Sequence, residues 1–161
     1  MVLSPHNPLK KKSTLANDYD RLHLLNLAIG DNNKIKASDI EFKLPKPSYT
    51  IDTMTYLHEK YPEHKFALIM GGDSLASLHK WKNYELLLEK YQIYVYKRPF
   101  KDSGDLLDHP NVVVSDAPLI EISSSYIRQL IKEKKSIRYM VTDKVFDYLQ
   151  DYRIYDRLLN Q

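Results

Sequence analysis

The chain has 161 residues, of which 43% are hydrophobic and 28% charged, and this length and balance fit one globular domain and exclude wholesale disorder and a fibrous repeat. The sequence has no cysteine, which excludes disulfides, thiolate metal sites and a cysteine nucleophile, and its formal net charge of +3 is too small to argue for nucleic acid. No uncharged apolar run approaches the roughly 18 residues that span a bilayer, so we expect a soluble, cytoplasmic protein without a membrane partner.

The N-terminal part predicts a short strand, a loop, a helix and a second strand. Residues 1–3 form the first strand, and the prolines and lysines of residues 4–13 are typical of a solvated loop. Apolar residues at helical spacing follow, with Asn17 or Asp18 as the N-cap and Gly30 at the end. Alternation over residues 35–42 indicates a strand with a bulge near Ser38.

The remainder of the sequence alternates helices and strands. We expect a helix from Ser48 or Thr50 to Pro62, and a fully buried strand over residues 66–70. The later predicted elements are helical segments over 74–82 and 84–91, a strand over 93–96, a loop over 99–110, short strands over 112–114 and 119–122, a helix from Ser124 or Ser125 to Lys134, and a helix over 142–152. This alternation predicts an α/β fold with a doubly wound, mostly parallel sheet.

Ligands of open parallel sheets bind beyond the carboxyl ends of the strands, and three segments lie at such ends. In the first, Gly71 and Gly72 let a ligand approach the backbone, and Asp73 can accept hydrogen bonds from a ribose hydroxyl. The alternative is a plain strand-to-helix turn in which Asp73 is the N-cap.

The second segment, residues 122–128, passes from a strand into a helix through three serines. Free amides, serine hydroxyls and the positive end of the helix dipole meet there, and the guanidinium of Arg128 lies about one turn further on. This pattern predicts a phosphate site. A serine-rich cap beside a surface arginine is the alternative.

The third segment is the loop over residues 4–10, which can present Asn7 and Lys10 to an anion. Its alternatives are a solvated lysine run and a small RNA-binding surface on residues 10–12. The sequence contains none of the motifs G-x-G-x-x-G, G-x-x-x-x-G-K, G-x-S-x-G and H-E-x-x-H, and its 6 histidines show no ligand spacing. We therefore expect phosphate chemistry without a covalent nucleophile or a metal held by side chains alone.

Five segments together resemble, in order and spacing, the motifs of bacterial nicotinate-nucleotide adenylyltransferases. They are Ser4 to Lys10, Pro47 to Thr53, Gly71 to Leu75 with Trp81 downstream, Arg98-Pro99, and Ile122 to Arg128. The resemblance implies a Rossmann-like nucleotidyltransferase that joins ATP and nicotinate mononucleotide into deamido-NAD and pyrophosphate, in NAD biosynthesis. It also implies a Mg²⁺ ion with the ATP, and it leaves open a homo-oligomer.

The resemblance also implies roles for particular residues. Arg128 and Ser124 match the catalytic residues that hold the ATP phosphates. The ATP site comprises Gly71, Gly72, Asp73, Ile122, Ser123, Ser124 and Arg128, and the mononucleotide site comprises Asn7, Lys10, Tyr49, Thr50, Trp81 and Arg98. Within the second set, Trp81 matches the aromatic residue that stacks on the pyridine ring, and Tyr49 with Thr50 matches the segment that recognises its carboxylate.

Members of the family begin with a strand, a loop and a helix that carry the pattern G-x-F-x-P-x-H-x-G-H, and this pattern is absent from the sequence. We therefore expect residues 1–161 to be a single, N-terminally shortened nucleotidyltransferase domain of marginal stability and reduced activity. Two alternatives stay open: a related nucleotidyltransferase with another phosphate acceptor, and a nucleotide-binding module that does not catalyse.

Overall fold

The computed structural model describes the chain except for residues 6–15, 98–103, 119, 153 and 156–161. The chain divides into two units, one made of residues 49–121 and the other of residues 1–48 together with 122–161. Each unit has its own packing. The expectation of a single domain stays a prediction.

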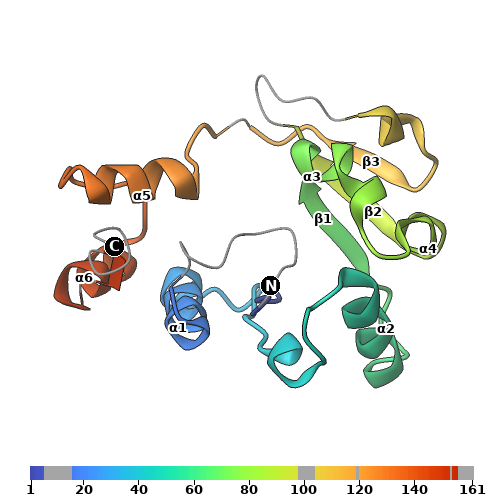
Figure 1. The fold of residues 1–161 in the computed structure, drawn as a ribbon, viewed down its shortest axis with the longest axis horizontal. Coiled ribbons are helices and arrows are strands. Elements are labelled where there is room, and N and C mark those ends of the chain that lie inside the picture. Colours follow the sequence, from blue (N-terminus) through green and yellow to red (C-terminus); the bar gives the residue numbers. More distant parts are fainter. Residues whose placement is uncertain (6–15, 98–103, 119, 153, 156–161) are drawn as a thin grey trace. The chain divides into compact units, whose positions relative to one another are not determined.

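Residues 49–121 form a parallel sheet with helices in the connections (Figure 1). The 3-stranded sheet has the order β1-β2-β3, and both pairings are parallel. Its elements are α2 (Thr50–Lys60), β1 (Ala67–Gly71), α3 (Gly72–Ala76), η3 (Leu78–Lys80), α4 (Tyr84–Lys90), β2 (Gln92–Tyr96), η4 (Asp105–Asp108) and β3 (Val112–Ser115). The predicted α/β class is confirmed, because each parallel pair needs a crossover connection.

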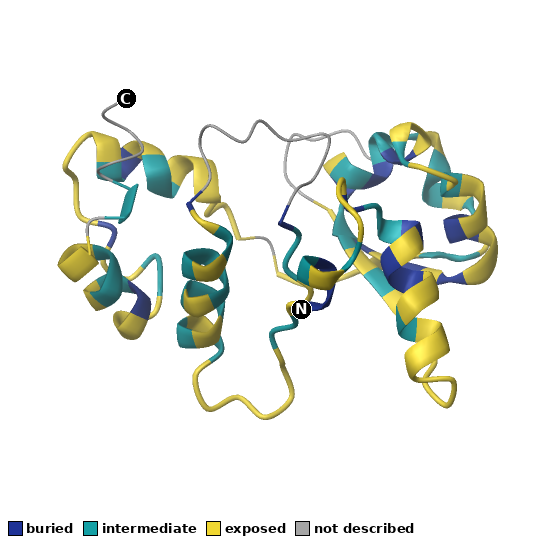
Figure 2. Ribbon diagram, turned by 60° about the horizontal axis from the view of Figure 1, so that its bottom comes forward, coloured by how far each residue is buried: buried dark blue, intermediate teal, exposed yellow. Residues whose placement is uncertain are grey.

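The core of this unit lies on one face of the sheet. Ile93 and Val95 of β2 are fully buried, and they belong to a cluster with apolar residues of α2, α3, η3 and α4. In Figure 2 the buried positions of these helices alternate with exposed ones, as expected for amphipathic segments. Ile69, between two inward-facing residues of β1, is 84% exposed. The fully buried strand expected at residues 66–70 is therefore wrong, because the helices of this unit cover only the face opposite Ile69.

A strand expected over residues 119–122 is also absent from the part of this segment that the structure describes. The hydroxyl of Tyr96 donates to the carbonyl oxygen of Pro118 at 2.8 Å and accepts from the backbone N–H of Ile120 at 2.7 Å. These backbone groups bond to a side chain in place of a neighbouring strand. Ile120 itself is 67% exposed.

The other unit is mainly helical and contains α1 (Asp18–Ile29), η2 (Ile40–Lys43), α5 (Ser124–Lys132) and α6 (Asp143–Tyr152) (Figure 1). The predicted N-cap of α1 is confirmed, because the side chain of Asn17 accepts from the N–H of Tyr19, and Gly30 ends the helix with a positive φ. The rings of His23 in α1 and Tyr148 in α6 lie 4.6 Å apart.

The strand expected over residues 35–42 is reduced to a single parallel bridge between Val2 and Ser38. The hydroxyl of Ser38 accepts from the N–H of Ile40, and the chain then turns into η2. A local bond of this kind competes with the hydrogen bonds of a sheet, which is why the alternating pattern does not produce a strand here. Over the described part of the chain, no helix combines the length and apolarity needed to cross a membrane.

Candidate functional site

The carboxyl ends of the three strands lie in register in the unit of residues 49–121. Gly71 at the end of β1 pairs with Tyr96 of β2, which pairs with Ser115 of β3. β1 passes directly into α3, whose N-cap is Gly71 and whose first turn contains Asp73. Asp73 is therefore not the cap, and the alternative of an Asp73-capped turn is wrong. The backbone at Gly72 is buried, whereas Asp73 is exposed.

Gly104 packs against the end of α3 and was not singled out in the sequence. Its φ is 71°, and a Cβ atom placed there would lie 2.9 Å from the Cα atom of Ala76. Both the backbone conformation and the close approach require glycine. The signal in the sequence was a lone glycine within a predicted loop, which does not by itself indicate what the glycine contacts.

The second group of expected residues lies at the start of α2. Tyr49 is the N-cap, with extended backbone and no capping bond from its side chain, and Thr50 is the first helical residue. The expected cap from Ser48 or Thr50 is wrong. The hydroxyl of Thr53 donates to the carbonyl oxygen of Tyr49 at 3.3 Å, so it braces the first turn from within the helix.

Trp81, the one tryptophan in the sequence, follows η3. It is partly buried and packs against the same apolar cluster as Tyr49. Its indole Nε1 atom is buried and has no hydrogen-bond partner among the described residues. Trp81 and Tyr49 are therefore attached to one core although they are distant in the sequence.

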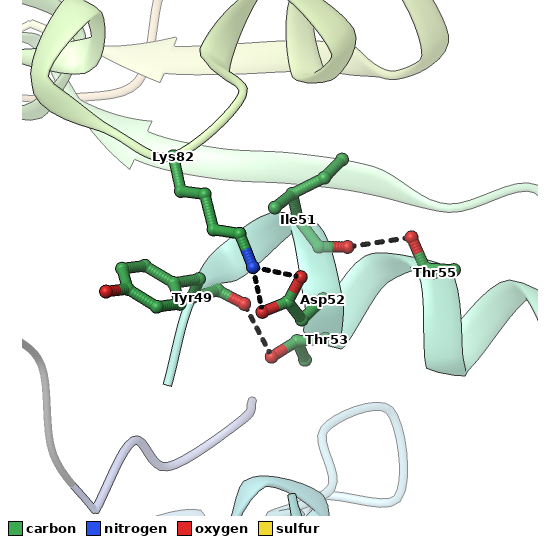
Figure 3. Close-up of polar contacts among 6 residues, drawn as sticks. All are labelled: Tyr49, Ile51, Asp52, Thr53, Thr55 and Lys82. Carbon is green, nitrogen blue, oxygen red and sulfur yellow. Dashed lines mark hydrogen bonds and ion pairs between the residues drawn. The ribbon is translucent and has the colours of Figure 1, made fainter. Parts of the chain in front are cut away.

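Lys82 joins these two segments, as Figure 3 shows. Its Nζ atom donates to both carboxylate oxygens of Asp52, at 3.0 and 2.9 Å, and lies 4.8 Å from the centroid of the Tyr49 ring. Sequence reasoning missed both Asp52 and Lys82. A carboxylate in the first turn of a predicted helix and a lysine after an aromatic residue are each too common to predict this pairing.

The expected phosphate-binding segment lies in the other unit and opens α5, which begins at Ser124 as predicted. The hydroxyl of Ser123 caps the helix by accepting from the N–H of Tyr126 at 3.1 Å. Ser123 and Ser124 are exposed, as is Ile122 before them, and the amide of Ser124 has no acceptor inside the helix. Arg128 donates to the hydroxyl of Ser125 at 3.3 Å, which places its guanidinium beside the first turn.

Tyr155 is a further ionisable group of this unit. Burial raises the pKa of its phenol, while the positive charges of Arg128 and Arg21 act in the opposite direction. The guanidinium of Arg21 is held by the carboxylate of Asp18 at 2.6 Å and by the carbonyl oxygen of Ser4 at 2.9 Å. The positive charges of Arg128 and Arg21 therefore both act on Tyr155, and Asp18 and Ser4 hold Arg21 in place.

Three expected site residues, Asn7, Lys10 and Arg98, lie outside the described residues. Within the described ranges, no group of three or more histidine, cysteine, aspartate or glutamate side chains is placed to hold a metal ion. The described site residues therefore form two groups, the α5 segment in one unit and the β1–α3 turn with the α2 start in the other.

Comparison with known proteins gives a consistent family. Residues 1–130 match the family described as cytidylyltransferase-like. A protein of Flavobacterium johnsoniae named "probable nicotinate-nucleotide adenylyltransferase" is 53% identical over 98% of this chain and 82% of its own length. A protein of the same name from Cytophaga hutchinsonii is 49% identical over 96% of this chain and 80% of its own length.

Solved structures agree on the fold. The nicotinic acid mononucleotide adenylyltransferase of Plasmodium falciparum, complexed with NaAD, superposes with a TM-score of 0.78 over 96% of this chain and 80% of its own. At 21% sequence identity this likeness concerns the fold alone. A structure of the same enzyme complexed with APC gives a TM-score of 0.71 at 18% identity.

Proposed function

Because this chain belongs to the nicotinate-nucleotide adenylyltransferases of the cytidylyltransferase-like family, we propose that it transfers the adenylyl group of ATP to nicotinate mononucleotide. The products are deamido-NAD and pyrophosphate, and the reaction belongs to NAD biosynthesis. The observation that carries this proposal is 52% identity to a relative with this name over 98% of the chain. The chain is thus a nucleotidyltransferase with a Rossmann-like fold.

The start of α5 binds the ATP phosphates in this proposal. The exposed serines and the unpaired first-turn amide favour an anion, and the guanidinium of Arg128 lies beside them. Arg128 and Ser124 stabilise the charge that builds up on the phosphates as the α-phosphorus reacts. Ile122 and Ser123 contribute the backbone that leads into this turn.

The β1–α3 turn holds the adenosine in this proposal. Gly71 is partly exposed and leaves room for the ribose beside the backbone, and the exposed carboxylate of Asp73 accepts hydrogen bonds from its hydroxyl groups. Gly72 is buried between them and is assigned to this turn from its match to the family motif. The position of this turn at the carboxyl end of β1 supports the assignment, since ligands of such sheets bind at this edge.

The nicotinate mononucleotide lies against the start of α2 and the segment after η3. We assign Tyr49 and Thr50 to its carboxylate, because helix amides at an N-terminus favour an anion. We assign Trp81 to its pyridinium ring, because an indole face attracts a cation. Asn7, Lys10 and Arg98, which lie outside the described residues, are assigned to its phosphate from their match to the family motifs.

The reaction itself needs no covalent intermediate with the protein. A phosphate oxygen of the mononucleotide attacks the α-phosphorus of ATP and forms the new P–O bond. The bond from that phosphorus to the bridging oxygen breaks, and pyrophosphate leaves with the electron pair. Catalysis then rests on positioning and charge stabilisation. A divalent cation accompanies ATP in nucleotidyltransferases, and we assign it as Mg²⁺ that arrives on the phosphate oxygens of the nucleotide.

The remaining expectations concern the setting of the enzyme. The relatives are bacterial and the proposed substrates are small cytosolic nucleotides, which supports a cytoplasmic location. We propose that the chain has no nucleic-acid or membrane partner. We also propose that it can form a homo-oligomer, and a measurement of its molecular mass in solution tests this.

The test is pyrophosphate release by the purified polypeptide from ATP and each of three acceptors: nicotinate mononucleotide, its amide and phosphopantetheine. We expect release with the acid mononucleotide. If pyrophosphate is released with phosphopantetheine and with neither mononucleotide, the chain is a related nucleotidyltransferase with another phosphate acceptor. Calorimetric binding of ATP without release from any acceptor would support a nucleotide-binding module instead.

A further inference from the structure

An ion pair connects two segments that the sequence keeps far apart. Lys82 and Asp52 are separated by 30 residues, and the ammonium contacts both oxygens of the carboxylate. Figure 3 shows the lysine side chain descending from the segment after η3 to the first turn of α2. Both residues belong to the unit of residues 49–121.

The place of the pair is informative because of its immediate neighbours. Lys82 directly follows Trp81, and Asp52 lies in the turn that Tyr49 and Thr50 begin. The α2 start has no capping bond from the side chain of Tyr49. The ion pair between Lys82 and Asp52 therefore ties the start of α2 to a distant segment, at a helix end whose cap residue forms no side-chain hydrogen bond.

The Tyr49 ring completes the arrangement. The ammonium of Lys82 lies 4.8 Å from the ring centroid, within the range of a cation–π contact. The three protons of an ammonium allow it to serve both carboxylate oxygens and still face the ring. One cation thereby restricts the aromatic side chain at the cap and the carboxylate of the first turn together.

The pair is too exposed to be explained by stability. The side chains of Lys82 and Asp52 are 43% and 49% exposed, and ion pairs in such positions contribute little to folding. The unit also has its own apolar cluster, which includes fully buried Leu75, Leu78 and Leu87. Loss of the pair is expected to leave the fold and the packing of Trp81 and Tyr49 on this cluster intact, and to remove the polar link that limits small movements between the two segments.

We infer that Asp52 and Lys82 are positioning residues that set the spacing between the two sides of the pyridine subsite, Trp81 on one side and Tyr49 with Thr50 on the other. This inference rests on the proposed function for the identity of the ligand. Lys82 acts through Trp81 and Tyr49, and its charge is neutralised by Asp52. A direct role for the lysine, in which its ammonium attracts the substrate carboxylate, makes a different prediction for Asp52.

The experiment uses Trp81 as its own reporter, since it is the single tryptophan of the chain. Nicotinate mononucleotide is titrated into the full chain, and quenching of tryptophan fluorescence gives the dissociation constant without any need for turnover. The variants are Asp52→Asn, Lys82→Met, the double variant and Lys82→Arg. Acrylamide quenching of the ligand-free proteins reports how freely the indole moves.

We expect each single variant to weaken binding about three- to fivefold, which corresponds to about 0.6 to 1 kcal/mol, the upper part of the range for exposed pairs. The double variant should bind as weakly as either single one, since the pair acts as a unit. Lys82→Arg should restore affinity, because a guanidinium also bonds both oxygens of a carboxylate. Acrylamide should quench Trp81 more strongly in the weakened variants.

Lys80→Met is the matched control, because it removes the same charge from an exposed lysine two residues away. Its affinity should equal that of the wild type. If Lys82→Met weakens binding while Asp52→Asn leaves it unchanged or tightens it, the lysine acts on the ligand directly and the inference is overturned. Unchanged affinity in both variants overturns it as well.

Failure of the proposed function looks different. If the wild-type chain shows no fluorescence change with nicotinate mononucleotide, the ligand is wrong. The acrylamide measurement on the ligand-free variants still decides whether the ion pair holds Trp81. An indole equally accessible in the wild type and in Asp52→Asn would show that the pair does not position it.

Discussion

The first turns of α5 and α2 present two ways to organise a helix start. At α5 the contacts are local: Ser123 bonds to Tyr126 and Arg128 bonds to Ser125, each three residues away. At α2 the cap side chain forms no such bond, and the contact comes from Lys82, 30 residues away. The first arrangement forms whenever its helix forms, whereas the second exists only after residues 49–121 have folded.

The largest effect should come from the local site. Arg128→Ala is expected to lower ATP-dependent pyrophosphate release at least about 100-fold, because a charge that stabilises the developing phosphate charge is lost. The circular dichroism spectrum should be unchanged, since Arg128 is only partly buried and bonds one serine. Turnover equal to the wild type would remove the phosphate site from α5.

The next largest effect is expected at Trp81, which follows η3 and packs against the same apolar cluster as Tyr49. Trp81→Ala is expected to weaken the binding of nicotinate mononucleotide about 2- to 30-fold, the range of a cation–π contact. Trp81→Phe retains most of the packing against the core and should lose less. Calorimetry measures both, because the fluorescent reporter is gone. Equal affinity in the alanine variant and the wild type would assign Trp81 to the core alone.

Smaller changes at the two helix starts are expected to differ in what they affect, stability at α5 and mononucleotide affinity at α2. Ser123→Ala should lower the free energy of unfolding by about 1 kcal/mol, the usual cost of a lost N-cap bond, with no effect on mononucleotide affinity. Asp52→Asn should lower the free energy of unfolding by less than Ser123→Ala does, and it should weaken the binding of nicotinate mononucleotide. Urea unfolding and fluorescence titration measure the two quantities. A loss of affinity in Ser123→Ala as large as that in Asp52→Asn would contradict the separation of the two starts.

The smallest effect concerns pH at the far end of α5. Hydrogen bonds from Lys135 and Gln129 lower the pKa of Glu133 below its ordinary value of 4.5. A lowered folded-state pKa stabilises the fold above the ordinary value, and this contribution disappears as the pH falls through the lowered pKa. The melting temperature should therefore fall slightly faster with acid in the wild type than in Glu133→Gln. Identical profiles would show that this exposed pair contributes nothing.

Sequence reasoning was most successful where structure is specified by near neighbours. The cap of α1 at Asn17, the start of α5 at Ser124 and the parallel α/β arrangement are all confirmed. It failed where a side chain takes the backbone hydrogen bonds that a strand would need, either from nearby, as Ser38 does, or from another segment. The hydroxyl of Tyr96 prevents a strand near Ile120, although the residues there have high strand propensity.

The site divides in the same way. The motif at Gly71 to Asp73 could be read from the sequence because a strand end and a helix start follow one another along the chain, and the motif at Ile122 to Arg128 because a serine cap directly precedes its helix. Asp52, Lys82 and Gly104 could not, since each matters through a contact with a distant segment. Nothing in the local pattern of an exposed lysine or a loop glycine identifies its partner.

The amino-acid sequence by itself determined the fold class, the family motifs and the start of α5, because helix capping and hydrophobic periodicity act over a few residues. Only the tertiary structure decided which face of β1 is covered, which segments form strands and which lysine contacts the start of α2. Those features depend on packing between segments far apart in the chain, where the gain from each contact competes with the entropy of bringing the segments together.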